Sequence, residues 1–326
     1  MKNCKVLVTG AAGFIGSHLS ELLVERGYKV KAFVRYNSKN DWGWLEYSKY
    51  KDEMEIFVGD LRDYDAVKNA VKNTDIIFHL GALIGIPYSY YSPDAYLEVN
   101  IKGTLNILNA ARDLNLKKIV HTSTSEIYGT AQFVPITELH PINPQSPYAA
   151  TKSAADFLAL SFYRSFDLPV AIIRPFNTYG PRQSSRAIIP TVITQILSGG
   201  KKISLGSLTP TRDLTFVKDT AEAFLKIAES ENTVGEIINA GSKFEISIND
   251  LVKKISMLIG EEIIVEQTEE RKRPEKSEVE RLFADNSKIK NITGWVPKYS
   301  LDSGLTETIE WMKLNLKNYK SGIYNV

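Results

Sequence analysis

Short runs of β-branched and other apolar residues alternate with longer amphipathic segments over the first 175 residues. The short runs predict strands at residues 5–9, 29–34, 55–58, 76–80, 118–122 and 170–174, with a loop from residue 81 to Pro93. The longer segments predict helices at residues 14–26, 63–72, 94–114 and 148–166. This alternation predicts an α/β fold with a doubly wound parallel sheet, which binds ligands at the carboxyl ends of its strands.

The pattern changes after Pro175, where Pro, Gly, Ser and Arg cluster in residues 177–186. The elements predicted beyond it are helices at 188–197 and 218–229, a strand at 236–240, and short strands near 203 and 214. We expect a large α/β domain of residues 1–176 plus about 214–241. Residues 177–213 and 242–326 are expected to form a smaller mixed α/β cap that binds substrate above the crevice of the large domain.

Composition excludes several classes of protein. The 326 residues are 43% hydrophobic, which is enough for a folded core, and 40 basic residues nearly balance 38 acidic ones. A net charge of +2 gives little support for a nucleic-acid partner. One cysteine, Cys4, fits a reducing compartment, and the short apolar run at the amino terminus is neither a signal peptide nor a membrane segment. A cytoplasmic protein is expected, and the four scattered histidines predict no metal site.

Glycine spacing marks the junction of the first predicted strand and helix. Gly10, Gly13 and Gly16 lie there, and Phe14 and Ile15 lead into the helix. Glycines allow a tight turn and a close approach of the backbone to a diphosphate, which then lies at the positive end of the helix. The motif therefore predicts a dinucleotide bound to a Rossmann sheet.

The end of the second predicted strand bears on which dinucleotide is bound. An acidic residue there holds the ribose hydroxyls of NAD, whereas this chain has Arg35 and Ser38, which could hold the 2′-phosphate of NADP. NADP is therefore expected, with NAD as the alternative if Arg35 only solvates a loop or stacks on adenine. Asp60, after the third strand, is expected either to accept from the adenine amino group or to cap a helix.

The residues that indicate catalysis follow the fifth predicted strand. Tyr148 and Lys152 are four residues apart and share one face of a helix. A lysine ammonium beside a phenol lowers the phenol pKa, so Tyr148 is expected to act as a base. Glu126 lies at the strand end that faces the crevice, and its alternative role is that of a solvated glutamate before a turn.

Taken together, these motifs resemble the extended short-chain dehydrogenases/reductases that epimerise or dehydrate nucleotide sugars. The resemblance spans the chain and rests on TGAAGFIG, GDLRD, EVNIKGTLNIL, STSEIYG, YAATK and RPFNTYGPRQ. It implies that Thr124 and Tyr148 bind the sugar 4-hydroxyl, that Tyr148 takes its proton, and that Lys152 also holds the nicotinamide ribose. It further implies a tightly bound, recycled cofactor contacted by Leu61, Leu80, Gly81, Ala82 and Asn100.

Within that family, Glu126 favours a 4,6-dehydratase. A ketone at C4 acidifies the C5 proton, and a carboxylate can remove it while the C6 hydroxyl leaves as water and hydride returns to C6. Many such dehydratases have Asp-Glu where this chain has Ser125 and Glu126, so the acid at the C6 hydroxyl stays open. Ser-Glu resembles GDP-mannose 4,6-dehydratases and UDP-glucuronate decarboxylases. A decarboxylase, a 4-epimerase and a non-catalytic dinucleotide-sensing regulator therefore remain alternatives.

Two further segments, residues 82–90 with Tyr88 and residues 273–281, resemble the dehydratases of legionaminic-acid synthesis. These enzymes act on N-acetylglucosamine linked to UDP or GDP; UDP, GDP and dTDP stay open here. By family position, Asn177, Arg212 and Arg281 are expected at the diphosphate, and Ile189, Pro190 and Gly206 at the base and ribose. Relatives form dimers through a four-helix bundle, so the helices at 94–114 and 148–166 are expected to pair in a homodimer.

Overall fold

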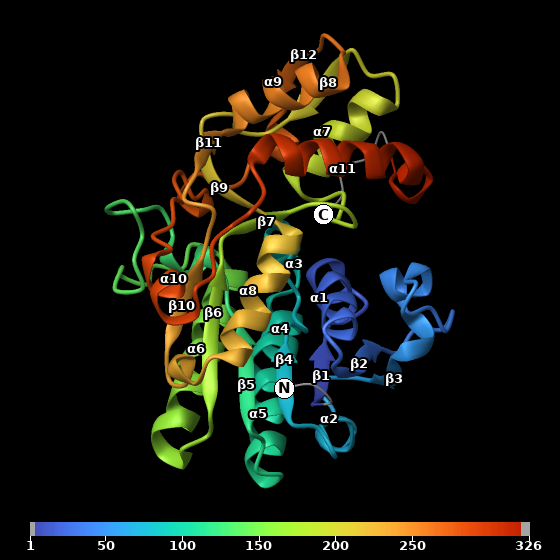
Figure 1. Cartoon of the computed structure of the whole chain (residues 1–326). Coiled ribbons are helices and arrows are strands. Elements are labelled where there is room, and N and C mark those ends of the chain that lie inside the picture. The colour runs from blue at the N-terminus through green and yellow to red at the C-terminus, as the bar shows by residue number, and fades with distance from the viewer. Residues whose placement is uncertain (1–3, 321–326) are drawn as a thin grey trace.

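The computed structural model describes residues 4–320, which form a large parallel sheet covered by helices and a smaller region beyond its carboxyl edge (Figure 1). The sheet order is β10-β6-β5-β4-β1-β2-β3. Its strands are β1 (Lys5–Thr9), β2 (Lys29–Arg35), β3 (Glu55–Gly59), β4 (Ile76–His79), β5 (Lys118–Thr122), β6 (Val170–Pro175) and β10 (Ile237–Ala240). The α/β prediction is confirmed, and the crevice of such a sheet lies beside β1, where the strand order reverses.

Helices cover both faces of this sheet. α1 (Phe14–Glu25) and α8 (Val217–Glu229) pack on one face, and α2 (Tyr64–Val71), α5 (Gly103–Asp113) and α6 (Pro147–Phe166) on the other. β1 shows the reason, because successive strand residues point to opposite faces. Val6 and Val8 join the core that includes α1 and α8, whereas Leu7 joins the core beneath α5 and α6.

The segment after β4 is more helical than its sequence predicts. Where a loop is expected, the chain forms α3 (Ile86–Tyr91), whereas α4 (Pro93–Tyr96) falls at the start of the helix predicted at residues 94–114. Each short helix has a proline in its first turn, where a missing N–H breaks no helical hydrogen bond. A π-helical turn (Leu97–Lys102) then joins α4 to α5 without interruption.

The smaller region contains two small sheets. β7 (Asn177–Tyr179), β9 (Thr211–Phe216) and β11 (Glu245–Ser247) form a mixed sheet, and β8 (Lys202–Leu205) pairs with β12 (Ile264–Gln267). Its α-helices are α7 (Ile188–Leu197), α9 (Ile248–Ile259) and α11 (Leu301–Asn315), whereas α10 (Ser287–Thr293) packs beside β10 and α8 of the large sheet. β9 spans the predicted domain boundary near residue 214. Beyond it, α8 packs on the large sheet and β10 is an edge strand of that sheet. The domain boundaries themselves stay a prediction.

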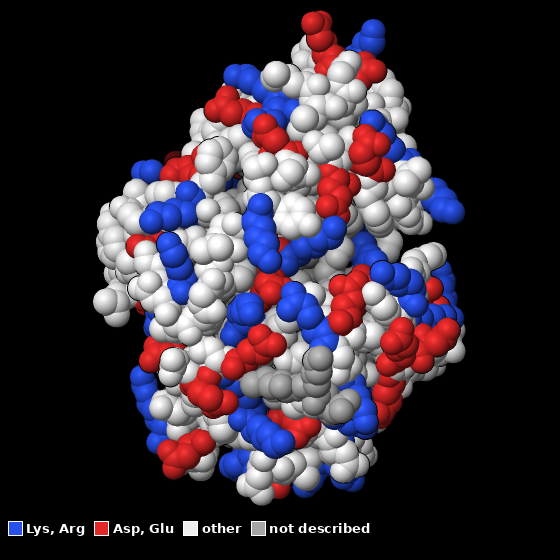
Figure 2. Space-filling model, viewed as in Figure 1, with Lys and Arg blue, Asp and Glu red and all other residues white. Residues whose placement is uncertain are grey.

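Charge is well mixed on the surface. Figure 2 shows basic and acidic side chains interspersed over the face viewed, as the near-zero net charge implies. Among residues 4–320, no helix combines the length and apolar character needed to cross a bilayer.

Candidate active site

The glycine-rich loop after β1 lies against the loop after β4. Gly10 has a φ of +70°, and a Cβ added to it would lie 2.9 Å from the backbone nitrogen of Gly81. A Cβ at Gly16 would overlap the carbonyl oxygen of Gly10. α1 begins at Phe14, and its N-cap residue Gly13 provides no side chain to the first turn. Bare backbone therefore lines this cradle, which fits the diphosphate of a dinucleotide.

Thr9 and His79 fasten these two loops together. The Thr9 hydroxyl accepts from the Gly81 amide at 3.0 Å and lies 2.8 Å from Nδ1 of His79. The other ring nitrogen of His79 lies 3.1 Å from the Thr104 hydroxyl. Burial, followed by the neighbouring His121, lowers the His79 pKa well below its usual value. His79 is therefore a neutral structural residue that sets the position of the Gly81 loop.

Asn100 holds the same loop from the other side. Its amide oxygen accepts from Leu83 N at 2.8 Å, and its Nδ2 donates to Leu83 O at 3.0 Å and to Thr151 at 3.1 Å. Only 1% of the Asn100 surface is exposed, so its side chain holds the loop of Leu80 and Ala82 in place and is not accessible to a ligand. Asn100 would therefore influence a bound cofactor indirectly, by fixing the backbone of this loop.

The far end of the cradle carries the predicted specificity residues. Arg35 ends β2 and is exposed, as is Ser38 in the following loop. Asp60 is held by Arg62 at 2.6 Å, and this hydrogen bond, with a smaller contribution from Arg35, keeps the Asp60 pKa low. Leu61 packs against Gly81. Arg35 is thus available to an anion. Asp60 is already paired with Arg62, so it would contact adenine while keeping that ion pair.

The catalytic candidates come from two elements and are all buried. Thr124 caps the 3₁₀ turn η4 (Ser125–Tyr128), where its hydroxyl accepts from the Glu126 amide at 3.2 Å. Ser125 and Glu126 follow it, while Tyr148 and Lys152 lie on α6. α6 is started by Ser146, whose hydroxyl accepts from Ala149 N at 3.1 Å. The structure therefore brings the predicted catalytic set to one edge of the sheet.

Burial dominates the titration of Tyr148 and Lys152. Burial raises the Tyr148 pKa above its usual value, a hydrogen bond with Thr124 opposes this, and the Glu126 carboxylate adds to the rise. Burial also lowers the Lys152 pKa to about 8. The Lys152 ammonium donates to the carbonyl of Thr122. In the chain alone the phenol pKa is therefore raised rather than lowered as expected, because burial of the phenol dominates.

Glu126 interacts electrostatically with a buried cation as well as with Tyr148. Its carboxylate acts electrostatically on Arg212 of β9, whose pKa burial lowers and Glu126 raises. Arg212 donates to Glu278 at 3.2 Å and to the Thr211 carbonyl at 2.9 Å. Within residues 4–320 the Glu126 carboxylate accepts no side-chain or backbone hydrogen bond that would fix it. The cap thus contributes a buried guanidinium to the crevice beside a carboxylate that has acceptor capacity to spare.

Arg281, also expected at the diphosphate, is held elsewhere. Its guanidinium binds both oxygens of Glu245, at 2.8 and 2.9 Å, and Thr211 donates to the same carboxylate. Thr211 forms a β-bridge with Arg281. Because Thr211 and Arg212 are neighbours along β9, their side chains point to opposite faces of that strand. The structure therefore does not bring Arg281 and Arg212 together.

The other predicted substrate residues lie around the cap. Asn177 begins β7, and its buried side-chain oxygen has no partner among the described residues, which suits a residue that binds a ligand. Ile189 and Pro190 are buried in the first turn of α7. Gly206 packs so closely on the backbone of Arg271 that a side chain would not fit there.

Two aromatic residues connect α3 to Tyr148. Tyr88, 40% exposed, lies 6.1 Å between ring centroids from Tyr96, and the Tyr96 ring lies 6.3 Å from that of Tyr148. Tyr96, which no sequence motif singled out, is fully buried and donates a hydrogen bond to the Gly85 carbonyl. Its position four residues before Asn100, on the same helical face, was the available signal.

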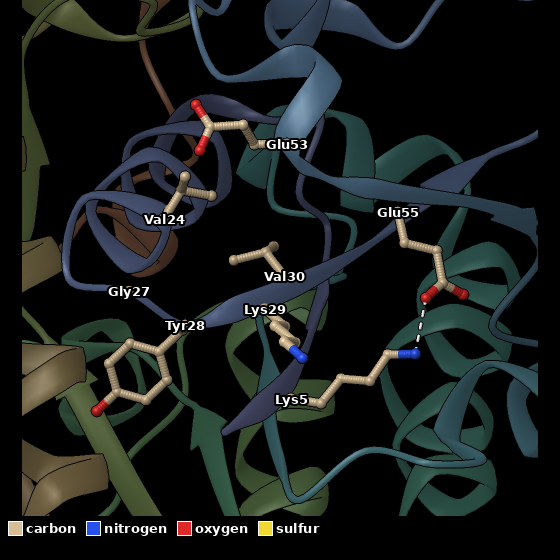
Figure 3. A pocket seen from close by; sticks show the side chains of 8 residues that line it. All are labelled: Lys5, Val24, Gly27, Tyr28, Lys29, Val30, Glu53 and Glu55. Carbon is tan, nitrogen blue, oxygen red and sulfur yellow. Dashed lines mark ion pairs between the residues drawn. The ribbon is translucent and has the colours of Figure 1, made fainter. Parts of the chain in front are cut away.

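A separate hollow lies at the amino ends of β1 and β2, away from these residues (Figure 3). Lys5, Tyr28, Lys29 and Glu55 line it, and Lys5 pairs with Glu55 at 2.9 Å. Ligands of such sheets bind at the opposite, carboxyl edge, so this hollow is not part of the candidate site.

Known proteins similar to this chain carry out related but different reactions. A family model described as GDP-mannose 4,6 dehydratase matches residues 7–308. A UDP-glucuronate 4-epimerase of Thermodesulfobacterium geofontis is 34% identical over 97% of this chain and 98% of its own. A UDP-N-acetyl-alpha-D-glucosaminuronate decarboxylase of Bacillus cytotoxicus is also 34% identical, over 96% and 98%. The structure of DesIV, a dTDP-glucose 4,6-dehydratase of Streptomyces venezuelae with NAD and TYD bound, superposes with a TM-score of 0.90 at 28% identity, covering 97% of this chain and 99% of that one.

Proposed function

The chain belongs to the extended short-chain dehydrogenase/reductase family of nucleotide-sugar epimerases and dehydratases, and from this premise we propose that it is a nucleotide-sugar 4,6-dehydratase. The proposed substrate is N-acetylglucosamine linked to UDP or GDP, as in the dehydratases of legionaminic-acid synthesis, and the product is the 4-keto-6-deoxy sugar. The proposed cofactor is NADP in preference to NAD.

The observation that carries this proposal is the environment of Glu126. Glu126 is a buried residue, 8% exposed, and its carboxylate acts electrostatically on both Tyr148 and Arg212. No described residue hydrogen-bonds to the Glu126 carboxylate, so its oxygens remain available to a substrate in the crevice, as a general base requires. A 4-epimerase needs no carboxylate at this place, because nothing is removed from C5.

The proposal assigns a task to each of these residues. Tyr148, hydrogen-bonded with Thr124, takes the proton of the C4 hydroxyl, and Lys152 stabilises the phenolate charge. Glu126 removes the C5 proton made acidic by the C4 ketone. When bound in the Gly10–Gly81 cradle, the dinucleotide accepts the C4 hydride and returns it at C6, so no net oxidant is consumed.

The proton at the C6 hydroxyl needs a source, since Ser125 stands where many dehydratases have an aspartic acid. We assign this task to Glu126 as well. The proton it takes from C5 passes to the departing hydroxyl, so the C–O bond breaks, water leaves and the carboxylate is regenerated. The same group thus acts first as base and then as acid. Hydride return to C6 must be matched by a proton at C5, and the proton that Tyr148 took from the C4 hydroxyl balances it, so Tyr148 is regenerated as well.

The test compares the wild-type protein with Glu126→Gln on UDP- and GDP-linked N-acetylglucosamine. Wild-type product should be lighter by one water. Glu126→Gln should still reduce bound cofactor transiently, while product formation falls by about 1,000-fold, the range of a lost acid-base group. Full turnover by Glu126→Gln would contradict the proposal.

Product masses also distinguish the alternatives. Loss of carbon dioxide from UDP-glucuronate would favour a decarboxylase, and unchanged mass with an altered C4 configuration would favour a 4-epimerase. No turnover on any nucleotide sugar, together with nucleotide-dependent binding of a partner protein, would instead indicate a regulator.

A further inference from the structure

Glu126 and Tyr128 lie in the same 3₁₀ turn, and Tyr128 is held by a buried network. The Tyr128 side chain is fully buried. Its hydroxyl accepts from Nη1 of Arg174 at 2.9 Å and donates to the side-chain oxygen of Asn239 at 2.8 Å. The Arg174 guanidinium also lies 5.0 Å from the centre of the Tyr128 ring. The turn that presents Glu126 is thereby tied to strands β6 and β10.

The same guanidinium reaches the helix that carries Tyr148. Nε and Nη2 of Arg174 donate to one carboxylate oxygen of Asp156, at 3.2 and 3.1 Å. Asp156 lies on α6, one helical turn after Lys152, and is fully buried. The Ser123 hydroxyl donates to the same oxygen at 2.7 Å, just before the catalytic turn begins.

One arginine thus joins the element that holds the proposed C5 base to the element that holds the proposed C4 base. Every member is buried, so any movement that breaks a hydrogen bond leaves a charged or polar group unpaired out of water. Such a network tolerates little change in spacing. It is therefore suited to fixing the distance between the two reacting groups, which catalysis requires to within a fraction of an ångström.

We infer that Tyr128, Arg174 and Asp156 are positioning residues that set the Glu126 carboxylate relative to the Tyr148 hydroxyl. Through that distance they determine how fast C5 deprotonation follows C4 oxidation. The inference rests on the proposed role of Glu126 and extends it to residues that touch neither substrate nor cofactor.

The test is Tyr128→Phe, which keeps the ring and removes only the hydroxyl. C4 oxidation, followed by the absorbance of reduced nicotinamide in a single turnover, should stay within about threefold of wild type. Product formation should fall about 10- to 100-fold with KM nearly unchanged, because a misplacement of about 1 Å has that effect. Reduced cofactor should therefore accumulate, and exchange of the C5 proton with deuterated solvent should slow in parallel with product.

Tyr28→Phe is the matched control. Tyr28 is also buried, and its hydroxyl donates to Glu229 at 3.1 Å, near the amino ends of the strands. The Tyr28→Phe variant should lose comparable stability, but its ratio of the rate of C4 oxidation to the rate of product formation should remain that of the wild type. Ser123→Ala, which removes one hydrogen bond to Asp156, provides a milder variant with an intermediate ratio if Tyr128→Phe fails to fold.

The outcomes separate the two proposals. If Glu126→Gln turns over fully, the proposed function is wrong. If Glu126→Gln stops after C4 oxidation but Tyr128→Phe and Ser123→Ala slow both steps equally, or behave as Tyr28→Phe does, only the positioning role is overturned.

Discussion

Nη2 of Arg212 lies 3.2 Å from a carboxylate oxygen of Glu278; the Arg212 side chain is buried and that of Glu278 is 13% exposed. The pair lies where the cap meets the crevice, with Glu126 acting electrostatically on the same guanidinium. A diphosphate offers Arg212 a more highly charged acceptor than one carboxylate. In the free protein, Glu278 therefore holds a cation that the substrate would compete for.

If this competition operates, Glu278→Gln should bind UDP or GDP more tightly, by about 3- to 10-fold, because the guanidinium keeps its place but loses its competing anion. Arg212→Ala should weaken binding by about 10- to 100-fold. Calorimetric titration with UDP, GDP and dTDP measures both effects and identifies the base. Equal weakening by the two variants would mean that Glu278 orders Arg212 for binding.

Lys152 should reduce stability while it serves catalysis. Burial lowers its pKa from 10.5 to about 8, so the unfolded chain holds the proton more tightly. Below pH 8 both states are protonated and the full penalty applies; between pH 8 and 10.5 folding releases the proton and the free energy of unfolding rises with pH. This lowering of the Lys152 pKa corresponds to a loss of about 3 kcal/mol in the free energy of unfolding below pH 8.

Lys152→Met should therefore be inactive but more stable than wild type at pH 7, by at most about 3 kcal/mol. Urea unfolding at several pH values should show the advantage shrinking as the pH rises from 8 towards 10.5. A stability difference that does not vary with pH would show that Lys152 is not buried as a charge.

Arg35 should decide the cofactor preference. It ends β2 with an exposed side chain, and a guanidinium there can hold a 2′-phosphate. Arg35→Ala should weaken NADP binding by about 10-fold and leave NAD binding within about twofold. Fluorescence titration of both cofactors checks this. Tighter binding of NAD than NADP by the wild type would reject the NADP preference.

The homodimer expected from the sequence would need an apolar surface beside α5 and α6. Phe157 on α6 is 57% exposed and Leu97 in the preceding π-helical turn is 47% exposed. Apolar side chains on helices that cover one sheet face suit a helix bundle between two copies. Phe157→Glu should give a monomer in light scattering, whereas Phe244→Glu, a similarly exposed change in the cap, should not. A monomeric wild-type protein would exclude the dimer.

The amino-acid sequence by itself determined the strands, the main helices and the glycine turn. These follow from local periodicity and from positions such as Gly10, where only glycine fits the backbone. It also placed Glu126 at the carboxyl edge of the sheet, because Glu126 follows a parallel strand, and put Tyr148 and Lys152 on one helical face.

Only the tertiary structure decided how the charges pair and titrate. Arg212 meets Glu278 whereas Arg281 turns to Glu245, and Arg174 joins Tyr128 to Asp156. These partners lie far apart along the chain, so no local pattern encodes them. Burial at the site, which raises the pKa of Tyr148 and lowers that of Lys152, likewise depends on how the whole chain excludes water.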